Sequence, residues 1–92
     1  MMLYLVAYDV PDDRRRLRLA KSMLDFGSRV QYSVFECLLD DELYEQMLSV
    51  IRRRINDEED SVRIYPLCAA CRKRVVLIGG LPLSEDPEVI II

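Results

Sequence analysis

The sequence contains no histidine, and this absence removes whole classes of chemistry. Nucleophilic catalysis by serine or cysteine ordinarily needs a histidine base, so we expect none here. Only three glycines are present, and they form neither a phosphate-binding loop nor a dinucleotide-binding pattern. The chemistry that remains is that of carboxylates, arginines and a bound cation.

Long apolar stretches are also missing, although 51% of the 92 residues are hydrophobic. No segment reaches the roughly 20 residues that span a membrane, and no basic region precedes the first apolar strand, as it would in a signal peptide. We therefore expect one cytoplasmic domain, residues 1–92, without membrane contact. A chain this short buries only about two thirds of its unfolded surface, so oligomerisation would help to stabilise it.

Cysteine is scarce, with Cys37, Cys68 and Cys71 too few for a disulfide framework in a cytoplasmic chain. Cys68 and Cys71 form a single C-x-x-C pair. A zinc site on this pair would need Cys37 or a second subunit to reach four ligands, and a redox pair is another alternative. The sequence favours a third interpretation, in which the two are small apolar residues in a turn between strands.

Arginine, in contrast, is abundant: the net charge is −3, yet eleven of the thirteen basic residues are arginine. Most basic residues fall in three clusters, at 14–18, 52–54 and 72–74, whereas acids gather at 40–42 and 57–60. Charge separated in this way can give an acidic protein a positive face, and the guanidinium fork suits phosphate oxygens. The alternative is that each cluster is an ordinary solvated surface.

Hydrophobic periodicity predicts a chain of alternating strands and helices. Strands are expected at 2–9, 28–39, 61–67 and 74–79, and helices from the Asp12 cap to about Phe26 and over 42–55. The alternation within 28–39 slips near Ser33, which indicates a β-bulge or a break. We take the order as βαββαβ, which requires that the break divide 28–39 into two strands, and this order predicts an α+β, ferredoxin-like fold with one antiparallel sheet and two helices on one face.

Apolar residues also predict which helix faces are buried. In the first helix the expected stripe is Leu17, Ala20, Met23 and Leu24, closed by Gly27 as the residue after the helix. In the second helix, capped by Asp40 or Asp41, the expected stripe is Leu43, Met47, Leu48, Ile51 and Ile55.

An apolar run, PEVIII at 87–92, is left over at the end of the chain. An exposed apolar edge strand invites pairing with another chain. We therefore predict that residues 80–92 are exchanged between the two copies of a homodimer.

Asp9 is the one carboxylate set apart from the ordinary surface, because it ends an apolar strand. Burying such a carboxylate is unfavourable unless it is solvated, paired or bound to a cation. In a twofold dimer two copies of Asp9 could share magnesium, which needs few protein ligands, while nearby arginines hold phosphate. The alternative is that Asp9 hydrogen-bonds the turn that follows it.

Three segments together resemble the CRISPR-associated Cas2 family, the small partner of the integrase that captures new spacers. They are YLVAYDVPDDRRRLRLA, GSRVQYSVFEC and SVRIYPLCAAC, which stand in that family's order and spacing between residues 3 and 78. The resemblance implies a ferredoxin-like homodimer that exchanges its C-terminal segment and binds Mg²⁺ through Asp9 of each subunit. The family positions linked to nuclease activity fall on Tyr8, Arg16, Arg18, Arg29 and Phe35.

The same resemblance leaves two functions open. One is a magnesium-dependent endonuclease that cleaves phosphodiester bonds in RNA or DNA. The other is a non-catalytic scaffold that holds duplex DNA and bridges two integrase dimers during spacer acquisition. A ligand-sensing domain is a third alternative, but a fold alone does not establish a function.

Overall fold

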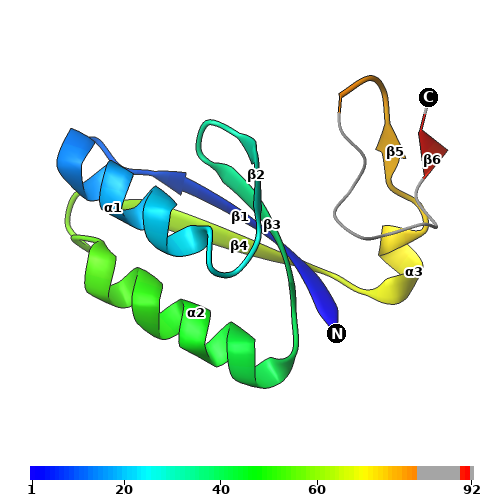
Figure 1. Ribbon diagram of the computed structural model, residues 1–92, viewed down its shortest axis with the longest axis horizontal. Coiled ribbons are helices and arrows are strands. Elements are labelled where there is room, and N and C mark those ends of the chain that lie inside the picture. Colours follow the sequence, from blue (N-terminus) through cyan, green and yellow to red (C-terminus); the bar gives the residue numbers. More distant parts are fainter. Residues whose placement is uncertain (81–89, 92) are drawn as a thin grey trace.

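The structure, a computed structural model, describes residues 1–80 and 90–91. Its first six elements follow the predicted βαββαβ order (Figure 1). The elements are β1 (Met2–Asp9), α1 (Asp13–Met23), β2 (Ser28–Gln31), β3 (Val34–Leu39), α2 (Asp41–Arg54), β4 (Ser61–Leu67), α3 (Ala69–Arg72), β5 (Val76–Leu77) and β6 (Ile90–Ile91).

The main sheet has four strands in the order β2-β3-β1-β4, and all neighbours are antiparallel. Strand β1 lies between β3 and β4, where Val6 stands opposite Phe35 on one side and Ile64 on the other. Helices α1 and α2 lie side by side on one face of this sheet (Figure 1). The predicted α+β, ferredoxin-like architecture is therefore confirmed.

The hydrophobic core fills the space between the sheet and the two helices. Strand β1 sends alternate side chains into it because successive residues of a strand point to opposite faces. The buried residues are Tyr4, Val6, Tyr8, Val10, Leu19, Ala20, Met23, Phe35, Cys37, Leu39, Met47 and Ile51.

The segment 28–39, predicted as a strand with a bulge or a break, is a hairpin of two strands. The chain reverses at Tyr32 and Ser33, and the pairing register shifts between Arg29 and Gln31. The slip in alternation near Ser33 therefore marks a reversal of direction. After it, Phe35 and every second residue of β3 face the helices, whereas all of β2 is exposed.

Both helices begin where the sequence predicts. Asp12 caps α1 by accepting a hydrogen bond from the Arg15 backbone N–H at 2.8 Å, and Asp40 caps α2 in the same way through Leu43 N–H. In α2 most of the predicted stripe is confirmed, since Met47 and Ile51 are buried and Leu43 and Ile55 pack against the core. Leu48, the remaining member, is only half-buried.

The predicted stripe of α1 is partly wrong. Ala20 and Met23 are buried, but Leu19 takes the place of Leu17 and Leu24, which are exposed. Residues two apart on a helix lie about 200° apart around its axis, so Leu17 points away from the face that Leu19 buries. Leu24 lies beyond the last helical residue, because α1 ends at Met23 and not at Phe26.

Gly27 is needed because of close packing, not because of its backbone angles. A Cβ atom at this position would lie 2.2 Å from the Glu36 carbonyl oxygen and 2.9 Å from the Cys37 Cα. Positive φ angles among the described glycines occur only at Gly79 and Gly80. The glycine lets the chain that follows α1 lie directly against β3.

The predicted strand at 74–79 is reduced to the two residues of β5, which lie outside the main sheet. Strand β5 pairs in parallel with β6, which contains two residues of the predicted 87–92 strand. Residues 81–89 and 92 lie outside the described residues, so the exchange of 80–92 between two copies stays a prediction. Within the described ranges, no helix is long and apolar enough to cross a membrane.

Candidate metal and nucleic-acid site

Asp9 is the last residue of β1 and stands opposite Ser61 of β4. Its side chain is exposed, and strand alternation places it on the sheet face opposite the helices. Among the described residues it has no hydrogen-bond or ion-pair partner. The alternative that Asp9 hydrogen-bonds the turn that follows it is therefore not supported by a contact. Both carboxylate oxygens are thus available to a hard cation such as Mg²⁺.

Within the described ranges, Asp9 stands alone as a candidate Mg²⁺ ligand, without a cluster of further carboxylates beside it. The described part of the chain contains no group of three or more histidine, cysteine, aspartate and glutamate side chains that could hold a metal ion. Magnesium retains several waters and commonly binds through one or two carboxylates plus substrate phosphate. Asp9 therefore fits the cation only as part of a site completed by another molecule.

Tyr8 precedes Asp9 and points to the opposite face, into the core. Its ring stacks on Phe35 with centroids 6.2 Å apart, and its hydroxyl group is buried without a hydrogen-bond partner. Burial raises the pKa of the Tyr8 phenol, and the nearby Arg29 and Arg16 guanidinium groups oppose that rise. The phenol is therefore neutral, and it can donate a hydrogen bond to a group that reaches it.

Arg16 and Arg29 meet at the exposed side chain of Tyr32 in the turn between β2 and β3. Arg16 lies over one part of the Tyr32 ring at 5.6 Å and donates from Nε to Tyr32 Oη at 3.0 Å. Arg29 lies 5.3 Å from the ring centre and donates to the Tyr32 carbonyl oxygen at 3.0 Å. These contacts hold two guanidinium groups around one aromatic ring.

Arg16 is fixed from the other side by the chain that leaves β1. It donates to the Val10 carbonyl oxygen at 2.9 Å and forms an ion pair with Asp13. Together Arg16, Arg29 and Tyr32 line a depression of about 250 Å³ beside α1. The sequence prediction missed Tyr32; its place beside the chain reversal, next to two predicted site residues, is the signal that could have identified it.

Arg18, the remaining predicted site residue, lies in a different place. It lines a depression of about 310 Å³ between the start of α1 and the end of α2, whose other charged lining residues are Asp12, Arg14, Arg15, Arg53 and Arg54. We call this depression the arginine groove, defined by Arg14, Arg18, Arg53 and Arg54. Among the described residues Arg14, Arg18 and Arg53 have no ion-pair partner, whereas Arg54 donates to Ser22 Oγ at 3.1 Å.

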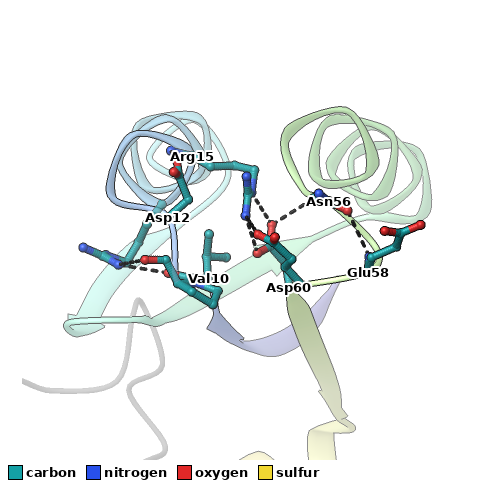
Figure 2. Close-up of polar contacts among 9 residues, drawn as sticks. Val10, Asp12, Arg15, Asn56, Glu58 and Asp60 are labelled. Atoms are coloured by element: carbon teal, nitrogen blue, oxygen red, sulfur yellow. Dashed lines mark hydrogen bonds and ion pairs between the residues drawn. The ribbon is translucent and has the colours of Figure 1, made fainter.

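Arg15 belongs to the same predicted cluster, but its side chain forms an ion pair within the fold. Figure 2 shows it reaching from α1 to Asp60, with Nε 2.6 Å and Nη2 3.0 Å from the carboxylate oxygens. The Asn56 backbone N–H also donates to Asp60 at 2.8 Å, and the Asp60 side chain is fully buried. The hydrogen bond from Arg15 lowers the pKa of Asp60. No local pattern in the sequence indicates this pair, because its members are 45 residues apart.

The structure thus brings Tyr8, Phe35, Arg16 and Arg29 together, and it places Asp9 and Arg18 apart from them. Asp9 lies on the face opposite the helices, and Arg18 lies between the helices. The arrangement offers an isolated carboxylate for a cation and two sets of guanidinium groups for phosphate.

Comparison with known proteins gives consistent results. The family model for CRISPR associated protein Cas2 matches residues 2–75. A relative from Synechocystis sp., named CRISPR-associated endoribonuclease Cas2 3, is 42% identical over 92 residues and the match covers 100% of each chain.

Solved structures match as well. Streptococcus pyogenes Cas2 superposes with a TM-score of 0.72 at 34% identity, covering 80% of this chain and 95% of that one. A chain of a partial Cas6-RT-Cas1–Cas2 complex superposes with a TM-score of 0.63 at 31% identity, covering 82% of this chain and 88% of that one.

Proposed function

The chain belongs to the CRISPR-associated Cas2 family, and we propose that it acts in CRISPR adaptation as a homodimeric, magnesium-dependent endonuclease. The observation that carries the proposal is Asp9, an exposed carboxylate without a partner among the described residues, at the end of the central strand. The name of the Synechocystis relative, an endoribonuclease, supports nuclease chemistry for this chain.

The sheet face that the helices leave uncovered supports a dimer of two copies of the chain. We call it the open face, defined by the apolar side chains of Leu5, Ala7, Val34, Tyr65 and Leu67. Tyr65 is 47% exposed there, whereas the others are half-buried. Glu36 and Arg63 lie on the same face, opposite Leu5 and Ala7 in the sheet. Apolar side chains beside such polar residues can mark a protein–protein interface, and pairing through this face would bring the ends of both β1 strands to one interface.

In the proposed dimer each Asp9 supplies one oxygen ligand to a shared Mg²⁺. The bound ion would supply Lewis acidity and an activated water for phosphodiester cleavage. Arg16 and Arg29, held in place by Tyr32, would bind phosphate oxygens of the substrate strand, because guanidinium groups form paired hydrogen bonds with them. Phe35 supports the Tyr8 ring, whose buried hydroxyl group is positioned to donate a hydrogen bond near those arginines.

The Asp9→Asn variant tests this proposal. We expect Mg²⁺-dependent cleavage of single-stranded RNA or duplex DNA to fall by about 100-fold or more, because losing even an outer partner of a bound metal costs about 10- to 100-fold. Asp57→Asn, an exposed acid in the turn before β4, is the matched control and should cleave at the wild-type rate. Cleavage that survives in Asp9→Asn would show that Asp9 is not the metal ligand.

The arginine groove favours a second function, that of a scaffold holding duplex DNA between integrase dimers. Arg14, Arg18 and Arg53 have no ion-pair partners among the described residues, so they can bind phosphate without losing an existing contact. The matching chain from the Cas1–Cas2 complex supports an integrase partner for this chain. The two functions are compatible, since the groove and Asp9 lie on different faces.

Changing Arg14 and Arg18 together to alanine tests the scaffold function. If each arginine binds one phosphate, the slope of log affinity against log salt should become shallower by about 2 for each copy of the chain that contacts the duplex, since each phosphate contact contributes about 0.9. Lys21→Ala, an exposed cation at the other end of α1, is the control and should leave the slope unchanged. An unchanged slope in the double variant would contradict DNA binding in the groove.

A further inference from the structure

Cys68 and Cys71 have no part in the functions proposed above, and their surroundings differ from the sequence prediction. The predicted turn between strands contains the short helix α3, and both thiols are exposed. Figure 1 shows α3 between β4 of the main sheet and the pair formed by β5 and β6. Exposed thiols in this place are accessible to reagents in solution.

The backbone holds the two cysteines one helical turn apart. The Arg72 backbone N–H donates to the Cys68 carbonyl oxygen at 2.9 Å, which closes the turn. Residues three apart in such a turn have Cβ atoms about 5–6 Å apart, and a disulfide needs Cβ atoms about 3.5–4.5 Å apart. A disulfide can therefore close if the two Cβ atoms approach by roughly 1–2 Å, a local movement at the first turn of a short exposed helix.

The two thiols are chemically unequal. Hydrogen bonds from the backbone N–H and the thiol of Cys71 lower the pKa of Cys68, whereas the same pairing raises the pKa of Cys71. A thiol with a lowered pKa is more often a thiolate, which is the attacking form. Cys68 is thus suited to attack, and Cys71 to complete the exchange.

Cys37 supplies a contrast within the same chain. Its side chain is fully buried, and burial raises the pKa of the thiol to about 12. A protonated, buried thiol is inert to exchange. The native protein therefore has two reactive thiols and one that should not react.

We propose that Cys68 and Cys71 form a redox-active dithiol that undergoes exchange with small disulfides, such as oxidised glutathione. The Cys68 thiolate attacks one sulfur of the disulfide, forms a mixed disulfide and releases one glutathione thiolate. Cys71 then loses its proton to solvent and attacks the Cys68 sulfur, releasing the second glutathione. Two protein thiols are oxidised, and one glutathione disulfide is reduced to two thiols.

The experiment equilibrates the full chain with defined ratios of reduced and oxidised glutathione, then denatures it and alkylates the remaining thiols for mass spectrometry. The reduced chain should take three labels and the oxidised chain one, at Cys37. Cys71→Ser should stop at a glutathione adduct on Cys68. Cys37→Ser, the matched control, should form the disulfide as readily as the wild type and then take no label.

Three results would overturn the proposal. The first is a wild-type chain that keeps all three thiols in excess oxidised glutathione. The second is a disulfide that joins two chains, seen as a covalent dimer without reductant. The third is a glutathione adduct in Cys71→Ser that lies on Cys37 and not on Cys68.

Discussion

At the scale of the residue, neighbouring arginines in α1 have separate roles. Arg15 forms an ion pair with Asp60, Arg16 contacts Tyr32, and Arg14 and Arg18 line the arginine groove. An α-helix turns by about 100° per residue, so a cluster in the sequence is distributed around the helix axis. A run of arginines therefore does not by itself predict one phosphate-binding surface.

The Asp60→Asn variant should lower the free energy of unfolding by about 1–3 kcal/mol at neutral pH, the range for a hydrogen bond to a charged group. Arg15 lowers the pKa of Asp60 below its ordinary value of 3.8. The stabilisation is therefore complete above about pH 4 and is lost as the pH falls through the lower pKa of the folded state. Urea unfolding at several pH values measures both effects.

The exposed neighbour Asp57 provides the comparison for this prediction. Asp57→Asn should leave both the unfolding free energy and its acid dependence close to those of the wild type. If the difference between wild type and Asp60→Asn stayed constant down to about pH 2, the lowered pKa would have to belong to another carboxylate.

At the scale of the element, local signals predicted where both helices begin and where strands β1 and β4 lie. Asp12 and Asp40 are short polar side chains before apolar stripes, and both are caps. The errors lie where distant residues decide the structure. The hairpin at 28–39 depends on pairing of β3 with β1, and the shortened strand at 74–79 lies outside the main sheet, which no local period reveals.

Gly27 shows the same dependence on a distant element, and it leads to a prediction. Gly27→Ala should lower the free energy of unfolding by about 1–3 kcal/mol, the usual cost of overpacking. The new Cβ would lie 2.2 Å from the Glu36 carbonyl oxygen, so β3 or the preceding chain must shift. Thermal or urea unfolding measures the loss, and Ser28→Ala, at the next and exposed position, should change little. If the two variants had the same free energy of unfolding, β3 would have to shift to accommodate the new Cβ atom without loss of stability.

At the scale of the whole molecule, the sequence identified the candidate site only in part. Asp9 was found because an apolar strand ends in a carboxylate, and the structure keeps it exposed. The positions of Arg18 and Tyr32 depend on how α1 and the β2–β3 hairpin pack, so they could not be predicted from spacing. The metal site that we propose is completed by a second copy of the chain, which is a property of the assembly and not of one chain.

The proposed dimer is therefore the point at which fold and chemistry can be tested together. Tyr65→Glu adds a charge to the open face, and Leu24→Glu adds the same charge to an exposed apolar residue directly after α1. We expect the Tyr65 variant to sediment as a monomer at concentrations where wild type and the Leu24 variant are dimers. Burying an unpaired carboxylate in an interface costs several kcal/mol, whereas a carboxylate at the solvent-exposed end of α1 costs little.

In these variants the cleavage activity should depend on dimer formation. If two copies of Asp9 form the metal site, the Tyr65→Glu monomer should lose Mg²⁺-dependent cleavage although its own Asp9 is intact, and Leu24→Glu should keep it. Raising the protein concentration should then restore both the dimer and the activity of the Tyr65 variant in parallel, because assembly obeys mass action. A monomer that cleaves at the wild-type rate would place the metal site within one chain, where Asp9 would have to act with ligands from substrate and water alone.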